Sequence, residues 1–519
     1  MNLKFYQQNQ AAVEAALKKG ERPEMATTTS RTWLDDLVGL HERLGVFAAL
    51  EQLPVARQRQ GVSDSLLLKT LAVLPFLEQP SLAAASGLLF GEPAILLRLG
   101  WSAEQIAWGD NFRHRGAGSL RSAASLPCHA DTLRDELRRI DSNDWDQLQH
   151  QYTTQLYQHG LVRGRTFAID GTGLDDGVRL VCLVCVSMQQ PLIVAWRLLE
   201  GDASEKGKEA AVTRSLIEQV VAAGGQGCIE LLLMDALYAD GPLLAWLKYQ
   251  QRIDAIVPLP SDRNMHADLL GLAKSGIMPL KRHSYVATLQ GHKQRRDLEI
   301  GARDGLTSWD SFIAVAKSYG ANEPCLWGCL IRETVPPAEQ IVITNNVPHN
   351  DIQNNDAKQN EVKQVDPKQP DAPKSSPAGK TICWSLVSTR YWPTGFAAFQ
   401  EYRQRWHIEN DGNRELKEGW QLEAQLWGRD FATQFGRVML TLLCFNTVQI
   451  LLSGAGKRLA ACGIRTLQRT FSRQLGHSPV VIYFAAWFAV FHVEELLTIL
   501  GQSPQQSLLP LGGYARPPP

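Results

Sequence analysis

The sequence predicts an α/β protein, on two observations. Three strand candidates follow one another with short connections, in the stretches RTFAID, VRLVCLVCVSM and PLIVAWRLLEG. The helical stretch KGKEAAVTRSLIEQVVAAGG then leads to IELLLMD, which has the composition of a strand buried on both faces. This order of strands and helix is typical of a mixed or parallel sheet that is covered by helices.

Composition limits the class of protein. A chain of 519 residues is too long to fold around a single compact core, so we expect about two to four domains. Lys and Arg together number 53, as do Asp and Glu, so any basic DNA-binding surface must be local. The N-terminus lacks a signal peptide, and we interpret the apolar runs 438–452 and 480–491 as buried core helices. These features predict a cytoplasmic protein.

The first 160 residues are predicted to be mostly helical. The stretches SDSLLLKTLAVLPFLE and PSLAAASGLLF carry apolar residues at helical intervals and begin with Ser or Asp suited to capping. DTLRDELRRI places Leu133, Leu137 and Ile140 inward. Its outward arginines, which are Arg134, Arg138 and Arg139, have two open interpretations: a solvated helix face or a local phosphate-contacting surface.

Two further stretches are informative. Cys182 and Cys185 form a CxxC inside a strand, where residues three apart point to opposite faces, so we predict buried thiols and no zinc site. From 249 to 385 the pattern is one of short strands and loops. Within it, 346–380 contains no Phe, Tyr, Trp, Leu or Met and is predicted to be disordered. TICWSLVST then resumes as a strand.

The stretch YRQRWHIENDGNRELKEGW, residues 402–420, is predicted to be an amphipathic helix. The inward face would hold Tyr402, Arg405, Trp406, Glu409, Asn413, Leu416, Lys417 and Trp420. The solvent face would hold Gln404, His407, Asp411, Arg414, Glu415 and Glu418. Arg405 and Glu409 then form either an ordinary surface ion pair or an inward pair whose carboxylate needs a partner or a metal.

Two predicted strands end in carboxylates, Asp170 after FAI and Asp235 after LLLM. Each has a simple explanation, because Asp is common where a strand gives way to a turn. Ligand sites also gather where strands end, and Glu409 would complete a trio. Four other carboxylates near this edge are interpreted as supporting or surface residues: Asp175, Asp176, Glu209 and Asp240.

Such a trio suits two-metal phosphoryl transfer, in which carboxylates hold two divalent ions. Oxygen ligands favour Mg²⁺ or Mn²⁺. Arg405 and Lys417 would neutralise phosphate charge, and Tyr402 would position a phosphate oxygen or a water molecule.

Three blocks, AIDGTG, MDALYAD and YRQRWHIENDGNRELKEGW, make the chain resemble the DDE transposases of bacterial insertion sequences, over roughly 165–455. The branch is marked by a Tyr-x2-Arg-x3-Glu-x6-Lys helix. Tyr402, Arg405 and Glu409 fit that spacing, whereas Lys417 lies one position later than the pattern expects.

The resemblance implies a ribonuclease-H-like mixed sheet with flanking helices, in which Asp170 and Asp235 end adjacent strands and Glu409 sits on a later helix. Asp170, Asp235 and Glu409 would be both the catalytic residues and the ligands of two Mg²⁺ or Mn²⁺ ions. The implied organisation is a helical DNA-binding region at 1–160, the core in two parts at 161–248 and 386–455, a β-rich insertion at 249–385 and a helical region at 456–519.

The resemblance also implies the activity. Family members nick transposon ends by hydrolysis, and the freed 3′-hydroxyl attacks other DNA. They usually act as homodimers in a synaptic complex with two terminal inverted repeats. Some flip a base onto an insertion-domain aromatic, for which Trp309 and Trp327 are candidates beside an ordinary buried role. The alternatives are a catalytically inactive DNA-binding protein of transposase descent and another nuclease on the same core, such as a resolvase.

Overall fold

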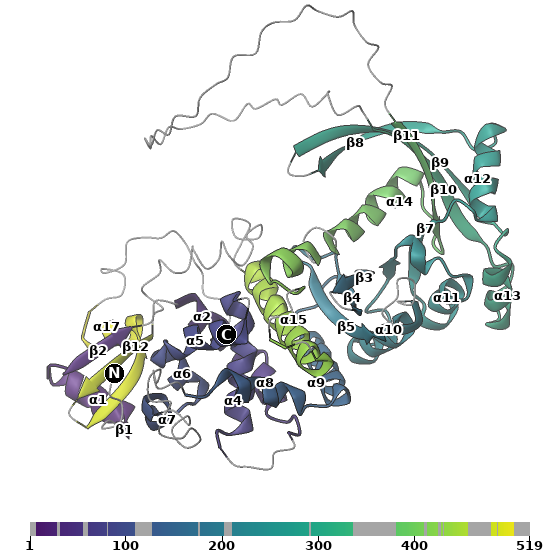
Figure 1. Ribbon diagram of the computed structural model, residues 1–519. Coiled ribbons are helices and arrows are strands. Elements are labelled where there is room, and N and C mark those ends of the chain that lie inside the picture. The colour runs from purple at the N-terminus through teal and green to yellow at the C-terminus, as the bar shows by residue number, and fades with distance from the viewer. Residues whose placement is uncertain are drawn as a thin grey trace, which may run out of the picture.

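The α/β prediction is confirmed by a computed structural model, in which a large mixed sheet is flanked by many helices (Figure 1). The structure describes residues 7–28, 32–55, 61–79, 81–108, 127–174, 177–201, 210–289, 292–335, 380–408, 413–423, 427–428, 430–454, 479–484 and 486–502. Its strands form a nine-stranded sheet in the order β5-β4-β3-β6-β7-β11-β10-β9-β8 and a four-stranded sheet in the order β1-β13-β12-β2.

The first half of the large sheet follows the predicted strand order. Its strands are β3 (Thr166–Leu174), β4 (Val178–Cys185), β5 (Leu192–Glu200), β6 (Leu231–Leu233) and β7 (Asp254–Leu259). β3, β4 and β5 are antiparallel neighbours, and helix α10 (Ala210–Gly224) then leads to β6, which lies parallel to both β3 and β7. The prediction that a strand ends at Asp170 is wrong. β3 continues to Leu174 because its second half pairs with β4, down to Leu174 opposite Val178.

The second half of the sheet is formed by four strands from the stretch where the sequence predicts a β-rich insertion. Its strands are β8 (Lys281–Leu289), β9 (His292–Leu306), β10 (Leu326–Val335) and β11 (Lys380–Ser388). All are antiparallel, and β11 pairs with β7, so the insertion extends the same sheet. The stretch predicted as strands and loops also contains helices α12 (Asn264–Lys274) and α13 (Asp310–Ser318). The segment predicted to be disordered lies outside the described residues, apart from Lys380 at the start of β11.

Alternate residues of the central strands face two different cores. Ala168, Leu231 and Leu233 pack into one core, together with the N-terminal helices and α15 (Phe431–Gly454). Phe167 and Leu232 pack into the other, with α10 and α11 (Gly241–Trp246). Cys182 belongs to the first core and Cys185 to the second, which confirms that the CxxC thiols are buried on opposite faces.

The N-terminal helices are α1 (Gln10–Lys18), α2 (Thr32–Arg43), α3 (Val46–Leu50), α4 (Asp64–Val73), α5 (Leu82–Phe90), α6 (Pro93–Leu99), α7 (Ala103–Trp108), α8 (Ala130–Arg138) and α9 (Ser142–Gln158). Several of them pack against α15, and α9 also contacts β5 and α10 (Figure 1). The predicted serine caps are present, since Ser63 accepts a hydrogen bond from Leu66 N and Ser81 from Ala84 N.

α15 confirms the predicted buried helix over 438–452. It has the length and hydropathy of a membrane-spanning helix, but 89% of its most apolar window is buried inside the protein. It contacts α2, α4, α8 and α9 as well as β5, so its apolar surface is covered on several sides by the rest of the chain.

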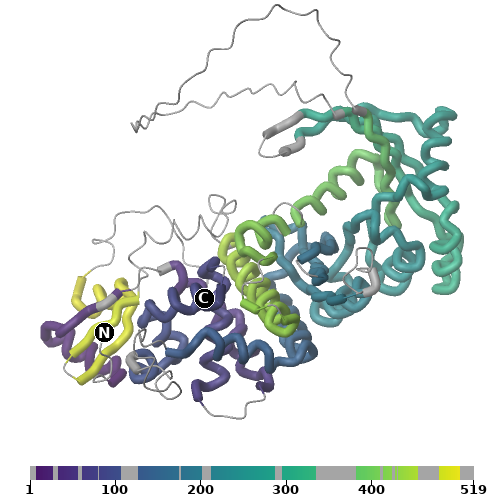
Figure 2. The backbone as a smooth tube through the Cα atoms, in the orientation of Figure 1, coloured from purple at the N-terminus to yellow at the C-terminus, as the bar shows by residue number. Residues whose placement is uncertain are grey.

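The two ends of the chain meet in the four-stranded sheet. Its strands are β1 (Gln7–Gln8), β2 (Met25–Thr28), β12 (Pro479–Phe484) and β13 (Trp487–His492), and helices α1 and α17 (Val493–Ile499) lie beside it. Figure 2 shows the purple N-terminal and yellow C-terminal segments in one lobe. The prediction of a buried helix over 480–491, in a helical C-terminal region, is wrong.

The error has a physical cause. Val480 and Ile482 pack with α1 in a small core of their own, whereas Val481 and Tyr483 pack into the large core. Because both faces of β12 are covered, the run is apolar without alternation. Periodicity cannot distinguish such a strand from a buried helix.

Candidate active site

Asp170 and Asp235 come from neighbouring parallel strands. The ladder of β3 and β6 pairs Thr166 with Leu231 and Ala168 with Leu233. Continuing this register by two residues sets Asp170 opposite Asp235, on strands that lie about 4.8 Å apart. The backbone at Asp235 is still extended, with φ −80° and ψ 167°.

Both aspartates share a face of the sheet. Ala168 and Leu233, each two residues earlier, pack into the core that contains α15. Because strand side chains alternate, Asp170 and Asp235 are directed to that same side. The sheet order therefore places the two residues on neighbouring strands and on the same face of the sheet.

The hydrogen bonds of the two carboxylates differ. Asp170 Oδ1 accepts from the backbone N–H of Gly171 at 3.0 Å, and Oδ2 accepts from Asn413 Nδ2 at 3.1 Å. Asp235 Oδ1 accepts from Ala236 N at 2.7 Å and caps the 3₁₀ turn Ala236–Tyr238, which is the turn role that the sequence allowed.

Cys182 lies directly opposite Asp170 on β4. Burial, and then the negative charge of Asp170, raise the pKa of the Cys182 thiol. The thiol therefore stays protonated beside the carboxylate, where a second negative charge would repel it.

The segment predicted as one regular helix is interrupted. α14 (Gly395–Tyr402) continues into a 3₁₀ turn, Arg403–Arg405, and a π turn follows at Glu415–Gly419. Glu409 is one of residues 409–412, which are outside the described part of the chain. The predicted faces nevertheless hold among the described residues. The buried ones include Tyr402, Arg405, Leu416 and Trp420, and the exposed ones include His407, Arg414 and Glu418.

Described residues before and after 409–412 contact β3 near its start, its middle and its end. Glu401 accepts a hydrogen bond from the Thr166 hydroxyl at 3.1 Å, Asn413 donates to Asp170, and Lys417 Nζ donates to Gly173 O at 3.2 Å. Residues on both sides of Glu409 in the sequence are thus held against the strand that carries Asp170. The sequence had placed Asn413 on the inward face but had given it no role; its spacing of one helical turn after Glu409 was the available signal.

Tyr402 and Arg405 contact each other in the interior. They are 5% and 7% exposed, and Arg405 Nε donates to Tyr402 Oη at 3.1 Å. The surface-ion-pair interpretation of Arg405 is therefore wrong. An ordinary pair of that spacing does occur on the solvent face, between Arg414 and Glu418 at 3.0 Å.

Lys417 is about one-third exposed and forms an ion pair with Glu423 at 2.5 Å. It lies within the π turn, which is closed by the bond from Trp420 N to Glu415 O at 3.0 Å. A π turn contains one residue more than the α-helical turn it replaces. Lys417 also lies one residue later in the sequence than the Tyr-x2-Arg-x3-Glu-x6-Lys pattern expects.

The described residues supply two of the three proposed carboxylate ligands for a divalent ion, Asp170 and Asp235. Carboxylate oxygens such as those of Asp170 and Asp235 suit Mg²⁺ or Mn²⁺. No cluster of three or more His, Cys, Asp or Glu side chains occurs in the part of the chain that the structure describes, from which Glu409 is missing. Of the alternative carboxylates, Asp240 caps α11 through Leu243 N, while Asp175, Asp176 and Glu209 lie outside the described residues.

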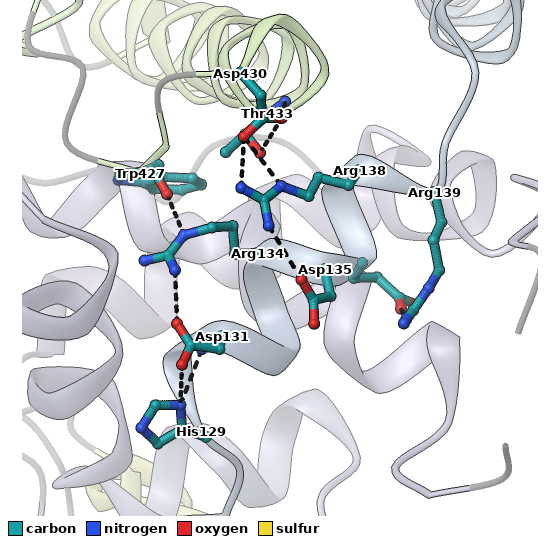
Figure 3. Close-up of polar contacts among 10 residues, drawn as sticks. His129, Asp131, Arg134, Asp135, Arg138, Arg139, Trp427, Asp430 and Thr433 are labelled. Carbon is teal, nitrogen blue, oxygen red and sulfur yellow. Dashed lines mark hydrogen bonds and ion pairs between the residues drawn. The ribbon is translucent and has the colours of Figure 1, made fainter.

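Arg134 and Arg138 of α8, and Arg139 directly after it, contact other groups of the protein (Figure 3). Arg134 Nε donates to Trp427 O at 2.7 Å, Arg138 binds Asp430 at 2.8 Å, and Arg139 lies 3.6 Å from Glu136. Neither interpretation made from the sequence included this role. Arg134 and Arg138 connect α8 to the chain that enters α15.

The two tryptophans considered for base flipping pack inside the protein. Trp327 is buried in the core on the α15 side of the sheet. Trp309 is partly buried against the opposite core, close to Gly241 at the start of α11. Both have the ordinary role that the sequence left open.

Comparisons with known proteins address the identity of the chain. A profile of the transposase DDE domain matches residues 167–447, which is more than half of the chain and includes Asp170, Asp235 and the Glu409 segment. A comparison with curated protein sequences found no match. The chain belongs to the transposase DDE domain family.

Proposed function

We propose that the protein binds transposon ends and catalyses divalent-metal-dependent DNA strand cleavage and strand transfer. One observation carries the proposal: Asp170 lies in β3, Asp235 follows the adjacent parallel strand β6, and described residues on both sides of Glu409 in the sequence contact β3. DNA transposition is the process to which the family assigns the chain.

The proposed core is ribonuclease-H-like, formed by 161–259 and 386–455. The adjacent positions of Asp170 and Asp235 support it. β7 pairs with β6, so we place the start of the insertion after Leu259 rather than at 249. The mostly helical region at 1–160 is proposed to contact DNA, together with β12, β13 and α17 from the C-terminal region.

Asp170, Asp235 and Glu409 are proposed to hold two Mg²⁺ or Mn²⁺ ions. When bound, such ions lower the pKa of an attacking oxygen and stabilise the leaving oxygen of an in-line displacement. Lys417 is accessible enough to contact a phosphate directly. Tyr402 and Arg405 lie deeper, so their proposed role is to supply positive charge and hydrogen bonds from beneath the phosphate.

The reaction has two steps. Water attacks the phosphorus at a transposon end; a new P–O bond forms, the bond from phosphorus to the 3′-oxygen breaks, and that oxygen takes up a proton. The resulting 3′-hydroxyl then attacks a phosphodiester of the target and loses its proton, so that one P–O bond forms as another breaks. We propose that a homodimer holds two terminal inverted repeats during these steps.

The test uses DNA fragments that span the two ends of the element flanking the gene, incubated with purified protein and Mg²⁺ or Mn²⁺. Asp170→Ala and Glu409→Ala should lower the cleavage rate by at least about 10³-fold, or about 4 kcal/mol of activation free energy. Asp240→Asn is the matched control and should cleave normally, because Asp240 caps α11. Wild-type protein that binds these ends but never cuts them would support the inactive DNA-binding alternative.

A further inference from the structure

We propose that Asn413 is a positioning residue for the metal site: its side-chain amide orients the carboxylate of Asp170 and fixes the stretch that begins at Asn413 against β3. The inference rests on the proposed function, because it assigns Asp170 to a metal ion. It adds a residue that the Tyr-Arg-Glu-Lys pattern does not contain.

The contacts of Asp170 carry the first step. Gly171 N donates to Oδ1 from within β3, and Asn413 Nδ2 donates to Oδ2 from the segment that crosses the strand. The two oxygens are therefore held by donors from different parts of the chain. A carboxylate that is held at both oxygens cannot rotate freely. Its orientation is therefore set before a metal ion binds.

The chemistry of the asparagine side chain carries the second step. An ionised carboxylate offers about four lone-pair positions, and the single donor group of Asn413 occupies one of them. Lys or Arg in place of Asn413 would add a positive charge that competes with the cation. A neutral amide orients the carboxylate without that charge, as hydrogen-bonding partners of metal ligands commonly do.

A second contact of the same segment makes the arrangement specific. Four residues after Asn413, Lys417 donates to Gly173 O, three residues after Asp170. The π turn Glu415–Gly419 supplies the additional residue in this stretch. The two contacts together fix both the position and the direction of the segment along β3.

The experiment measures Mn²⁺ binding to the full-length protein without DNA, by electron paramagnetic resonance of the free ion. Asn413→Ala should weaken Mn²⁺ binding by about 10- to 100-fold, the usual effect of removing a partner of a metal ligand. Asn413→Gln, which keeps the amide, should recover part of the affinity. Gln421→Ala is the matched control, because Gln421 donates its amide to Glu78 O and not to β3; it should bind Mn²⁺ as the wild type does.

The outcomes separate the two claims. If Asp170→Ala loses Mn²⁺ binding while Asn413→Ala keeps the wild-type affinity, the inference is overturned and the proposed site stands. If Asp170→Ala binds Mn²⁺ as tightly as the wild type, the proposed site itself fails. Thermal unfolding without metal identifies variants that do not fold. If Asn413→Ala does not fold, Asn413→Gln decides between the outcomes. Mn²⁺ binding by Asn413→Gln that is tighter than that of Asp170→Ala supports the amide role, and a loss of affinity equal to that of Asp170→Ala overturns it.

Discussion

Single residues of the candidate site already form ion pairs and hydrogen bonds within the protein. Lys417 illustrates this, because its ammonium group is held by Glu423 and by Gly173 O at the edge of the segment. If Lys417 binds DNA as proposed, Glu423 competes with the phosphate for the same positive charge. An exposed ion pair of this kind contributes little to stability, about 1 kcal/mol or less, so its effect should appear in binding.

Glu423→Gln should strengthen binding of the protein to transposon-end DNA, because it releases Lys417 for a phosphate. Glu418→Gln removes the same charge from the solvent face, where Glu418 pairs with Arg414, and serves as the control. Fluorescence anisotropy at several salt concentrations measures both. Equal affinities of the two variants would exclude a role of Glu423 in holding Lys417.

His41 in α2 is a second residue with a measurable consequence. Its Nδ1 lies 2.8 Å from the Thr447 hydroxyl in α15, and burial lowers its pKa to about 3. The unfolded chain takes up this proton near pH 6.5, whereas the folded chain does not until about pH 3. Stability from this group is therefore complete above pH 6.5 and declines as the pH falls below it, by at most about 1.4 kcal/mol per pH unit.

Urea unfolding at pH 7, 6 and 5 checks this expectation. His41→Gln should reduce the loss of stability on acidification. His159→Gln, at an exposed position after α9, should keep the wild-type dependence. An unchanged pH dependence in His41→Gln would show that His41 is not the group responsible.

Among the elements, α8 and α15 are joined by side chains that the sequence suggested for DNA. Asp430 accepts from Arg138 and also caps α15 through Thr433 N at 3.0 Å. Although burial opposes the shift, these hydrogen bonds and the Arg138 charge lower the pKa of Asp430 to about 2. The contribution of this carboxylate to stability is present above its ordinary pKa of 3.8 and is lost as the pH falls toward about 2.

Asp430→Ala should lower the free energy of unfolding by about 1 kcal/mol at pH 7, chiefly through loss of the helix cap. Arg138→Ala should cost less, because its pair with Asp430 is about half exposed. Arg163→Ala is the control, since Arg163 is exposed and donates to the nearby Gly160 O. A larger loss of end-DNA binding than of stability in Arg138→Ala would instead restore the phosphate-contact interpretation.

At the scale of the whole molecule, the N-terminal helices and the sheet share one hydrophobic core. Leu34, Leu68 and Leu133 from that region lie in the same cluster as Leu443 of α15 and Trp196 of β5. Removing residues 1–160 would expose the α15 surface that these helices cover. The matched family domain is therefore not expected to be an independent folding unit.

A fragment of residues 161–519 should aggregate or lack a cooperative unfolding transition, whereas the full chain should show one. Size-exclusion chromatography and thermal unfolding by circular dichroism distinguish the two. A monodisperse fragment that unfolds cooperatively would contradict the shared core.

The sequence by itself determined the elements with a clear period or a clear motif. The strands around 165–200, the buried strand before Asp235, the inward face of 402–420 and the family followed from local patterns of apolar residues and from motif spacing. These patterns report burial and chemistry one element at a time, so they needed no knowledge of the neighbours.

Only the tertiary structure decided which elements meet. The apolar run at 480–491 forms two strands, because β12 pairs with β2 and α1 covers one face of the pair. These contacts join residues from opposite ends of the sequence. The tertiary structure also extended β3 past Asp170 through pairing with β4, and it gave Asn413 a partner. Long-range pairing and packing determine such features, and a local period contains no information about them.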